Sequence, residues 1–343
     1  MRTAILLAAA SLLVSSSLAA QDVEADQADD GEVLSQQQTF SIQSATPEQW
    51  VSRLANASRT LNFSASFVAF QPGSDAVPYI WRHALSESGL SMEHLSLLNG
   101  PGREALRIGD KISYFEPDMP PYTLIADIIN GPLPGQLLYN PVALQDAYNF
   151  VLVGRSRVAG RPAQQLRLIS KDKSRFGYSI WLDQETGLLL KANMEDEQGQ
   201  VIEQVQIVDL LVYDEPSDYF AQIDRASLPE VVNISPSTAR IYNWDIGFKP
   251  QGMRAIKRDI HRLPITGNIV EYMMLTDGMV DVSVYVQRAD TVDEANAALR
   301  HQSNTLLTRQ VGNVQVTVVG KLPPQTANAI ATSVTLASTT PQP

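Results

Sequence analysis

The segment Gly177–Val208 constrains the fold more than any other part of the sequence, because it predicts three consecutive strands joined by two tight turns. Tyr178–Leu182 is rich in aromatic and β-branched residues, as strands usually are. Asp183–Gly187 then supplies an Asp that accepts backbone N–H bonds and a Gly that tolerates positive φ. Strands resume at Leu188–Met194 and, after a second acidic turn, at Val201–Val208. We therefore predict an antiparallel meander with one buried and one solvated face.

A helix and a series of short strands precede this meander. Thr46 is a predicted N-cap, Pro47 occupies the first helical position, and Gln49 completes a capping box. The helix carries an apolar stripe of Trp50, Leu54, Ala57 and Leu61. Short strands are then predicted at Phe63–Phe70, Tyr79–Ala84, Met92–Leu98, Glu104–Ile108 and Lys111–Glu116. Strands at this spacing favour a strongly curved antiparallel sheet.

Residues 117–149 are both apolar and interrupted by proline. Such a stretch is predicted to be neither a regular strand nor one long helix, yet its apolar residues should be buried. We expect it to cover the concave face of the curved sheet. Strand pairing resumes at Asn149–Val153 and Pro162–Ile169.

The chain after residue 240 has its own pattern. Residues 214–240 collect proline, serine and threonine, and predict a loop-like connection. Beyond it we predict three strands, at Met253–Ile260, Ile269–Leu275 and Met279–Val286, and then a helix within Thr291–His301. A hairpin of Thr305–Val311 with Val314–Val319 follows, and a last helix begins at Pro323.

Several of these segments carry a family resemblance. The meander contributes the pieces IWLD, TGLLLKA and DEQGQVIEQVQ. Supporting pieces lie on both sides of it, in the order in which the family has them: Ala57–Arg59 followed by Phe63–Phe70, then Leu97–Glu104, and near the end Val314–Gly320 before Pro323 and Pro324. Together they resemble the periplasmic sigma-E factor regulatory proteins, the RseB/MucB family. More loosely, they are similar to LolA- and LppX-like lipoprotein carriers, whose half-barrel that family shares.

The predicted fold class is α+β and mostly antiparallel β. It consists of an N-terminal curved half-barrel sheet covered by helices and a small C-terminal α+β domain. The predicted organisation is a signal peptide at 1–20, a disordered acidic arm at 21–45, a half-barrel at 46–215, a linker at 216–240, and a small partner-binding domain at 241–336.

The N-terminus predicts export to the periplasm. Arg2 precedes an apolar run at Ala4–Val14, and Ser17–Ala19 offers small residues for cleavage. The sequence has no Cys, which excludes a lipoprotein anchor and disulfide bonds. The formal net charge is −11, and much of it lies in the acidic arm, so a general nucleic-acid binder is not indicated.

No catalytic or metal-binding constellation is predicted. The four histidines, His83, His94, His261 and His301, are scattered, so their spacing predicts no helical zinc site. Asp183 and Glu185 sit in a turn without a neighbour that would separate their pKa values, and Glu195–Glu197 reads as a solvated hairpin tip. We expect a protein without catalytic residues, metal or cofactor, and not an enzyme.

A surplus of apolar side chains is predicted to face the inside of the curved sheet. One interpretation is an ordinary core, and the other is a lipid-sized cavity, which the resemblance favours. The lipid-pocket candidates are Phe67, Tyr79, Trp81, Ile125, Leu137, Leu138, Ile180 and Leu190.

A basic cluster stands out in the C-terminal part. It is either a solvated face or a binding surface for an acidic peptide or lipid phosphates. Alternation along Met253–Ile260 predicts Arg254 and Arg258 on one face with Ile256 and Ile260. The partner-binding candidates are Arg254, Lys257, Arg258 and Arg262.

The resemblance implies a negative regulator of the sigma-E envelope-stress response. Such a protein binds the periplasmic part of a membrane-embedded anti-sigma factor, shields it from site-1 proteolysis, and senses lipid or lipopolysaccharide. The alternative is a periplasmic lipid or lipoprotein carrier, which would use the half-barrel alone and would not need residues 241–336. Homo-oligomerisation stays open.

Overall fold

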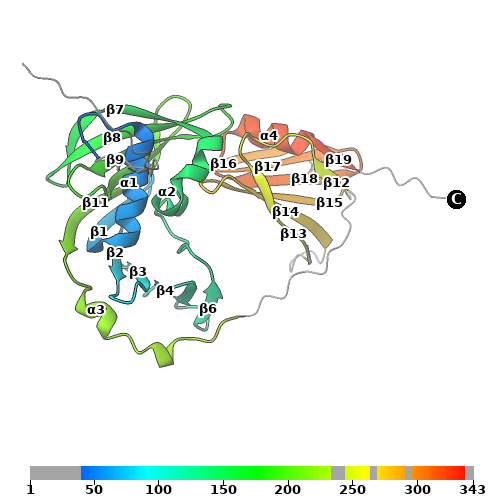
Figure 1. Ribbon diagram of the computed structural model, residues 1–343. Helices are drawn as coiled ribbons and strands as arrows, with labels where there is room; N and C mark the ends of the chain where they lie inside the picture. Colours follow the sequence, from blue (N-terminus) through cyan, green and yellow to red (C-terminus); the bar gives the residue numbers. More distant parts are fainter. Residues whose placement is uncertain (1–39, 233–243, 263–268, 290–295, 337–343) are drawn as a thin grey trace, which may run out of the picture. The chain divides into compact units, whose positions relative to one another are not determined.

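The computed structural model describes residues 40–232, 244–262, 269–289 and 296–336. These residues form an eleven-stranded sheet, a six-stranded sheet and a two-stranded ribbon, and every strand pairing is antiparallel. Figure 1 shows the strands of the large curved sheet and those of the small C-terminal sheet as two separate sheets. The predicted signal peptide, most of the acidic arm, residues 233–240 of the linker and the end of the chain lie outside the described residues.

The eleven-stranded sheet has the order β6-β5-β4-β3-β2-β1-β11-β10-β9-β8-β7. Its strands are β1 (Asn62–Phe70), β2 (Val77–Leu85), β3 (Ser91–Leu97), β4 (Glu104–Ile108), β5 (Lys111–Phe115), β6 (Tyr122–Ile125), β7 (Tyr148–Val158), β8 (Arg161–Ser170), β9 (Gly177–Asp183), β10 (Leu189–Glu195) and β11 (Val201–Tyr213). The pairing of β1 with β11 joins two hairpin series into one sheet. A curved sheet of short antiparallel strands is what the sequence predicted.

The predicted meander is confirmed as β9, β10 and β11, although β11 runs five residues beyond Val208, to Tyr213. Its first turn depends on Asp183, whose side chain is fully buried. The Asp183 carboxylate accepts hydrogen bonds from the Thr186 N–H at 3.1 Å and the Thr186 hydroxyl at 2.7 Å. Gly187 takes a φ of 86°, a value that disfavours residues with a Cβ. Asp183 therefore holds a turn together.

Helix α1 (Pro47–Thr60) begins as predicted. The Thr46 N–H donates to the Gln49 side chain at 2.8 Å, and the Gln49 N–H donates to the Thr46 hydroxyl at 3.3 Å. The helix buries Trp50 and Leu54 in the main core. In Figure 1 it lies beside α2 (Gly135–Tyr139), and the two helices are in contact. The capping box thus fixes where the helix starts, and the apolar stripe fixes which face is buried.

The segment 117–149 differs in part from the prediction. It contains a regular strand, because Tyr122–Ile125 forms β6 and pairs with β5 at the edge of the sheet. The remainder forms α2 and a 3₁₀ helix at Pro141–Asp146. These two short helices bury Leu137, Leu138 and Leu144 in the main core, so this part of the segment does cover the sheet.

The segment after β11 is not a free loop over its described length. It forms the short helix α3 (Asp218–Ala221) and a 3₁₀ turn at Arg225–Ser227. Phe220 is buried in a second small core with Ala84, Met92 and Leu106. The Tyr219 ring stacks on His94 with 4.4 Å between centroids, and Val231 bridges to Thr123 of β6. This segment, residues 214–232, is therefore packed against β2, β3 and β4.

We expect acidification to destabilise this packing. Burial is the largest cause that lowers the pKa of both His83 and His94 below the ordinary value of 6.5. His94 lies between Arg82 at 3.0 Å, Glu104 at 3.0 Å and the Tyr219 ring, while His83 contacts the Leu61 carbonyl and Ser91. Below pH 6.5 these two histidines bind protons in the unfolded chain but not yet in the folded chain. Their contribution to the free energy of unfolding is therefore complete above pH 6.5 and is lost as the pH falls from 6.5 through the lowered pKa of the folded state.

Thermal unfolding followed between about pH 7.5 and 5 checks this expectation. The His94→Gln variant keeps polar contacts but cannot titrate, so its melting temperature should fall less over the same range. If the melting temperature of the variant changed with pH as much as that of the wild type, His94 would not contribute to the pH dependence of stability.

The six-stranded sheet has the order β13-β14-β15-β18-β17-β16. Its strands are β13 (Arg254–Arg262), β14 (Ile269–Thr276), β15 (Asp281–Arg288), β16 (Ala297–His301), β17 (Asn304–Val311) and β18 (Val314–Gly320). Helix α4 (Pro324–Thr332) packs Ile330 and Ala331 onto one face, near the ribbon of β12 (Trp244–Ile246) and β19 (Val334–Leu336). This second core is separate from the first.

The predicted helix within Thr291–His301 is wrong for the residues that the structure describes. Ala297–His301 is strand β16, and it pairs with β17 from Ala297↔Thr308 to His301↔Asn304. Residues 290–295 lie outside the description. The alanines suit a helix locally, but hydrogen bonds to a neighbouring strand decide the conformation.

Candidate functional sites

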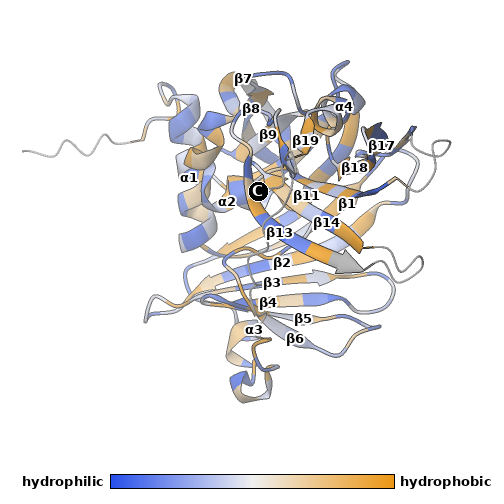
Figure 2. Cartoon of the chain, turned by 90° about the vertical axis from the view of Figure 1, so that its right-hand side faces the viewer, coloured by the Kyte–Doolittle hydropathy of each residue, from blue (hydrophilic) through white to orange (hydrophobic). Residues whose placement is uncertain are grey.

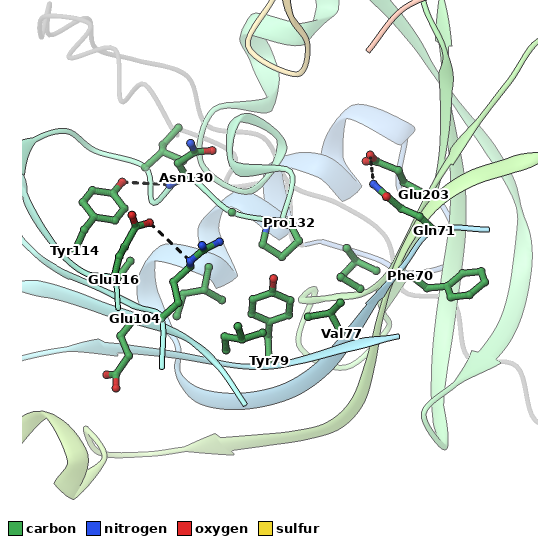
Figure 3. A pocket seen from close by; sticks show the side chains of 18 of the residues that line it. Phe70, Gln71, Val77, Tyr79, Glu104, Tyr114, Glu116, Asn130, Pro132 and Glu203 are labelled. Atoms are coloured by element: carbon green, nitrogen blue, oxygen red, sulfur yellow. Dashed lines mark hydrogen bonds and ion pairs between the residues drawn. The ribbon is translucent and has the colours of Figure 1, made fainter. Parts of the chain in front are cut away.

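A cavity of about 800 Å³ opens between the large sheet and residues 126–132 of the covering segment. Figure 3 shows Tyr114 and Glu116 towards one end, Tyr79 and Pro132 in the middle, and Gln71 and Glu203 towards the other end. Its apolar lining is Ala69, Phe70, Val77, Leu95, Leu97, Ala105, Leu124, Ala126, Ile128, Pro132 and Val205. A cavity of this size matches those that hold small molecules or apolar chains.

Three tyrosines give the cavity a polar-tipped aromatic wall. Tyr79 stacks on Phe67 with 5.1 Å between ring centroids, and Tyr114 stacks on Tyr122 at 5.3 Å. Burial raises the pKa of Tyr114, against the opposing effect of the Asn130 backbone N–H, which donates to its hydroxyl at 3.5 Å. The three side chains present apolar ring faces with hydroxyl groups to the cavity.

The charged residues Asp75, Arg103, Glu104, Glu116, Glu203 and Lys321 line the cavity, and all of them except Asp75 belong to ion pairs that the structure shows. Arg103 lies 3.8 Å from Glu116, and Lys321 lies 2.8 Å from Glu203. The Glu104 carboxylate binds His94 at 3.0 Å, and in Figure 3 its side chain points away from the cavity. The wall consequently combines a mainly uncharged interior with an ion pair near each end, which suits an amphiphilic ligand.

The structure distributes the eight predicted pocket residues unevenly. Tyr79 lines the cavity, and Phe67 supports it from the core. Ile125 is 68% exposed on the edge strand β6 and does not line the cavity. The other five, Trp81, Leu137, Leu138, Ile180 and Leu190, are buried in the main core.

Most of the cavity wall was not found from the sequence. Tyr114 and Tyr122 come from β5 and β6, Leu95 and Leu97 from β3, and Asn130 from the covering segment. Alternation along β3 and β5 was a usable signal, since it places these side chains on the same face as Trp81. Which inward-facing positions are left open, however, depends on where the covering segment lies.

The basic strand β13 is the second candidate site, and it forms one edge of the six-stranded sheet. A bulge between Ala255 and Lys257 interrupts its pairing with β14, so Arg254 pairs with Thr276, Lys257 with Met274 and Arg258 with Met273. Paired residues share a face, and neighbours along β14 alternate. Arg254 and Lys257 are therefore on one face and Arg258 on the other. The prediction that Arg254 and Arg258 share a face is wrong, because a bulge adds one residue and inverts the alternation.

The described side chains of β13 are largely exposed. Ile256 is 51% exposed, and Figure 2 shows both hydrophilic and hydrophobic colour along the strand. Arg258 binds Asp245 at 3.0 Å, and Lys257 lies 3.9 Å from Asp259. The pKa of Asp245 is lowered, first by the hydrogen bond from the Ile246 backbone N–H; burial opposes this, and Lys249 and Arg258 lower the pKa further. Arg262 belongs to β13, but its side chain lies outside the description.

The face that carries Arg254 and Lys257 is opposite to the one covered by α4. Across the sheet it continues with half-buried polar and aromatic side chains, including Tyr285, Gln315 and Thr317. Tyr272 and Tyr285 lie 5.1 Å apart between ring centroids. Leu299 and Leu306 pair at the far edge and are 62% and 39% exposed. We call this surface the open face of the C-terminal sheet; it is amphipathic, and basic at its β13 edge.

Within residues 40–232, 244–262, 269–289 and 296–336, no group of three or more acidic, His or Cys side chains is arranged to hold a metal. The same described residues include no helix that is long and apolar enough to cross a membrane.

Comparison with known proteins connects these features to one family. The MucB/RseB N-terminal domain matches residues 46–232, and the MucB/RseB C-terminal domain matches residues 238–335. The chain belongs to the MucB/RseB family. The resemblance predicted from the sequence is therefore confirmed.

Curated relatives extend over most of the chain. The sigma-E factor regulatory protein RseB of Salmonella typhimurium is 32% identical over 81% of this chain and 87% of its own length. That of Escherichia coli K12 is 31% identical over 85% of this chain and 92% of its own length. The solved MucA/MucB complex of Pseudomonas aeruginosa contains a chain with 27% identity and a TM-score of 0.69, covering 86% of this chain and all of that one. A further solved structure, of MucB in complex with MucA(peri), has a TM-score of 0.67.

Proposed function

We propose that this chain restrains a sigma-E-type envelope-stress response by binding the periplasmic part of a membrane-embedded anti-sigma factor. The observation that carries the proposal is similarity along both domains to MucB, whose solved structures include complexes with MucA. The chain would act after export to the periplasm and removal of residues 1–20. It would act by binding and not by catalysis.

We place the partner on the open face of the C-terminal sheet, at its β13 edge. A bound segment must be kept from a protease, which requires a surface with apolar area and a fixed register. Ile256, Leu299 and Leu306 offer apolar area, and Arg254 with Lys257 offers charge. Opposite charge steers the encounter, while apolar burial contributes most of the affinity.

Reversing the two charges of the open face should therefore slow association with the partner segment. For Arg254→Glu combined with Lys257→Glu, we expect an association rate about ten-fold lower at low salt, with a smaller loss at high salt because the charges are then screened. The measurement is binding kinetics of the mature chain with the periplasmic segment of its anti-sigma factor at two salt concentrations.

Arg258→Glu is the matched control, because Arg258 lies on the opposite face of the same strand. It should change the association rate much less than the double variant does. If both variants lowered the association rate equally, the effect would come from net charge and not from the open face. If the double variant associated at the wild-type rate, the open face would not be part of the interface.

The cavity supports a second activity, binding of a lipid or another amphiphile. Its apolar lining, its tyrosine wall and its volume carry this candidate. It would also serve the alternative of a lipid or lipoprotein carrier, but a carrier gives no role to the C-terminal sheet.

Leu97→Asp should weaken amphiphile binding by about ten-fold or more, because the ligand would have to desolvate a carboxylate in the cavity wall. The probe is N-phenyl-1-naphthylamine, followed by its fluorescence. Leu98→Asp is the matched control, since Leu98 is the next residue, is 53% exposed and does not line the cavity. Equal probe binding by all three proteins would argue against an apolar binding cavity.

A further inference from the structure

The C-terminal sheet domain contacts the large sheet domain at several points. Met279 packs against both cores, Arg300 lies 5.3 Å from the Phe176 ring centroid, and Gln302 donates to the Ser74 hydroxyl at 2.6 Å. Two further sets of contacts differ in burial. The first is a buried junction around Arg175 and Asp277, whose side chains form an ion pair and are both fully buried. The Arg175 guanidinium also donates to the Gln251 carbonyl at 2.6 Å. The Gln251 N–H in turn donates to Asp172 at 2.6 Å. Burial alone would raise the pKa of Asp172, but hydrogen bonds from Ser174 and from the Gln251 N–H outweigh it and lower the pKa to about 2.

Two glycines allow the close approach at this buried junction. Gly252 has a φ of 80°, and a Cβ there would lie 2.9 Å from the Ala147 side chain. Gly278 has a φ of 91°, and a Cβ there would lie 2.6 Å from Gln136 of α2. Both turns of the C-terminal domain thus fit closely against the segment that covers the large sheet, which requires a fixed contact at this point.

The second set is a rim junction at one end of the cavity, formed by Glu203, Lys321, Ser303 and Gln71. The Glu203 carboxylate of β11 accepts hydrogen bonds from Lys321 Nζ at 2.8 Å, from the Ser303 hydroxyl at 2.5 Å and from Gln71 Nε2 at 2.8 Å. Lys321 and Ser303 belong to the C-terminal domain. Glu203 and Lys321 both line the cavity, so the C-terminal domain supplies part of the cavity wall.

The two junctions should respond differently to solvent. Arg175 and Asp277 have no exposed side-chain surface, whereas the side chains of Glu203 and Lys321 are 19% and 41% exposed. Salt screens exposed pairs much more than buried ones. An exposed pair also contributes little, whereas a buried pair is costly to break once it has formed. The rim junction is therefore the contact that opens first.

We propose that the C-terminal domain is a movable wall of the cavity, which rotates about the buried junction and is held closed by Glu203 at the rim junction. Opening the rim junction would widen the cavity and move the open face of the C-terminal sheet without separating the domains. Any ligand that binds better to one of the two arrangements would shift the population towards it. The inference does not depend on the identity of the partner proposed above.

The absence of native Cys allows spin labels to be placed at chosen positions of the mature chain. Labels at Asp118 and Asn313, both exposed, report the distance between the domains, and labels at Asp118 and Gln198 report a distance within the large sheet domain. For Lys321→Gln and Glu203→Gln, the inter-domain distance distribution should become roughly two-fold wider, while the internal distribution should not change. Wild-type protein in about 0.5 M NaCl should shift in the same direction, because the Debye length is then only about 4 Å.

Arg167→Gln is the matched control: it removes an exposed ion pair with Glu195, at 3.2 Å, within the large sheet domain. Its inter-domain distribution should equal that of the wild type. The proposal is overturned if both rim variants keep the wild-type distribution. It is also overturned if they release the domains into a distribution as broad as that of an unrestrained linker, because the buried junction would then not act as a pivot.

Discussion

Glu93→Ala should lower the free energy of unfolding by about 3–5 kcal/mol, the usual cost of removing one partner from a buried ion pair. The Glu93 side chain is 4% exposed and accepts hydrogen bonds from Arg107 Nε at 3.0 Å and Trp81 Nε1 at 2.7 Å. Burial alone would lower the pKa of Arg107, but Glu93 and Tyr139 together outweigh it and raise that pKa. Without Glu93, the buried guanidinium loses its carboxylate and keeps the Gly109 carbonyl and the Ser91 hydroxyl as acceptors, with the Tyr139 ring centroid 5.6 Å away.

Urea unfolding of the mature chain measures this loss. Glu185→Ala is the matched control, because Glu185 also pairs with an arginine, Arg161 at 2.8 Å, but is 77% exposed. It should cost about 1 kcal/mol or less. A similar loss in both variants would mean that burial does not determine the contribution of the Glu93 pair.

Elements with short-range signals were predicted well from the sequence. The capping box of Thr46 and Gln49 and the turn held by Asp183 involve residues three or four positions apart. Their hydrogen bonds form whatever the rest of the chain does. The same holds for the strands of the meander, whose turns and alternation are both local.

Elements that depend on distant partners were predicted less well. Ala297–His301 has the composition of a helix but becomes a strand because β17 offers it hydrogen bonds. The Ala255/Lys257 bulge moves Arg258 to the other face of β13, and it is visible only once the register with β14 is known. A single extra residue thus inverts the alternation for the three candidates that follow it, Lys257, Arg258 and Arg262.

The cavity shows a different limit. Alternation identifies which side chains face the concave side of the sheet, and Tyr79, Trp81 and Ile180 do so. It does not say that Trp81 is buried in the same core as Leu137 and Leu138 of α2, whereas Tyr79 and Tyr114 line an open cavity. Leu137, predicted as a lipid-pocket residue, is a fully buried core residue, so we expect Leu137→Asp to prevent folding rather than to weaken ligand binding alone.

Asp277→Ala should also lower the free energy of unfolding by about 3–5 kcal/mol, since it removes the buried carboxylate from Arg175 and leaves only the partly exposed Asp172, at 3.7 Å, as an ion-pair partner. Unlike Glu93, which lies within one sheet, Asp277 belongs to the C-terminal domain and Arg175 to the large sheet domain. Its loss should therefore also uncouple the domains, so that a single unfolding transition divides into two. Calorimetry and urea unfolding with fluorescence detection measure both effects.

The double variant Arg175→Met with Asp277→Leu separates charge burial from contact between the domains. Replacing both partners of a buried pair by apolar residues of similar size leaves no uncompensated charge, and often recovers stability. We expect the double variant to regain most of the loss of Asp277→Ala and to unfold again in one transition. If it remains as unstable as the single variant, the hydrogen bonds of Arg175 to Gln251, and not its charge pair, hold the two domains together.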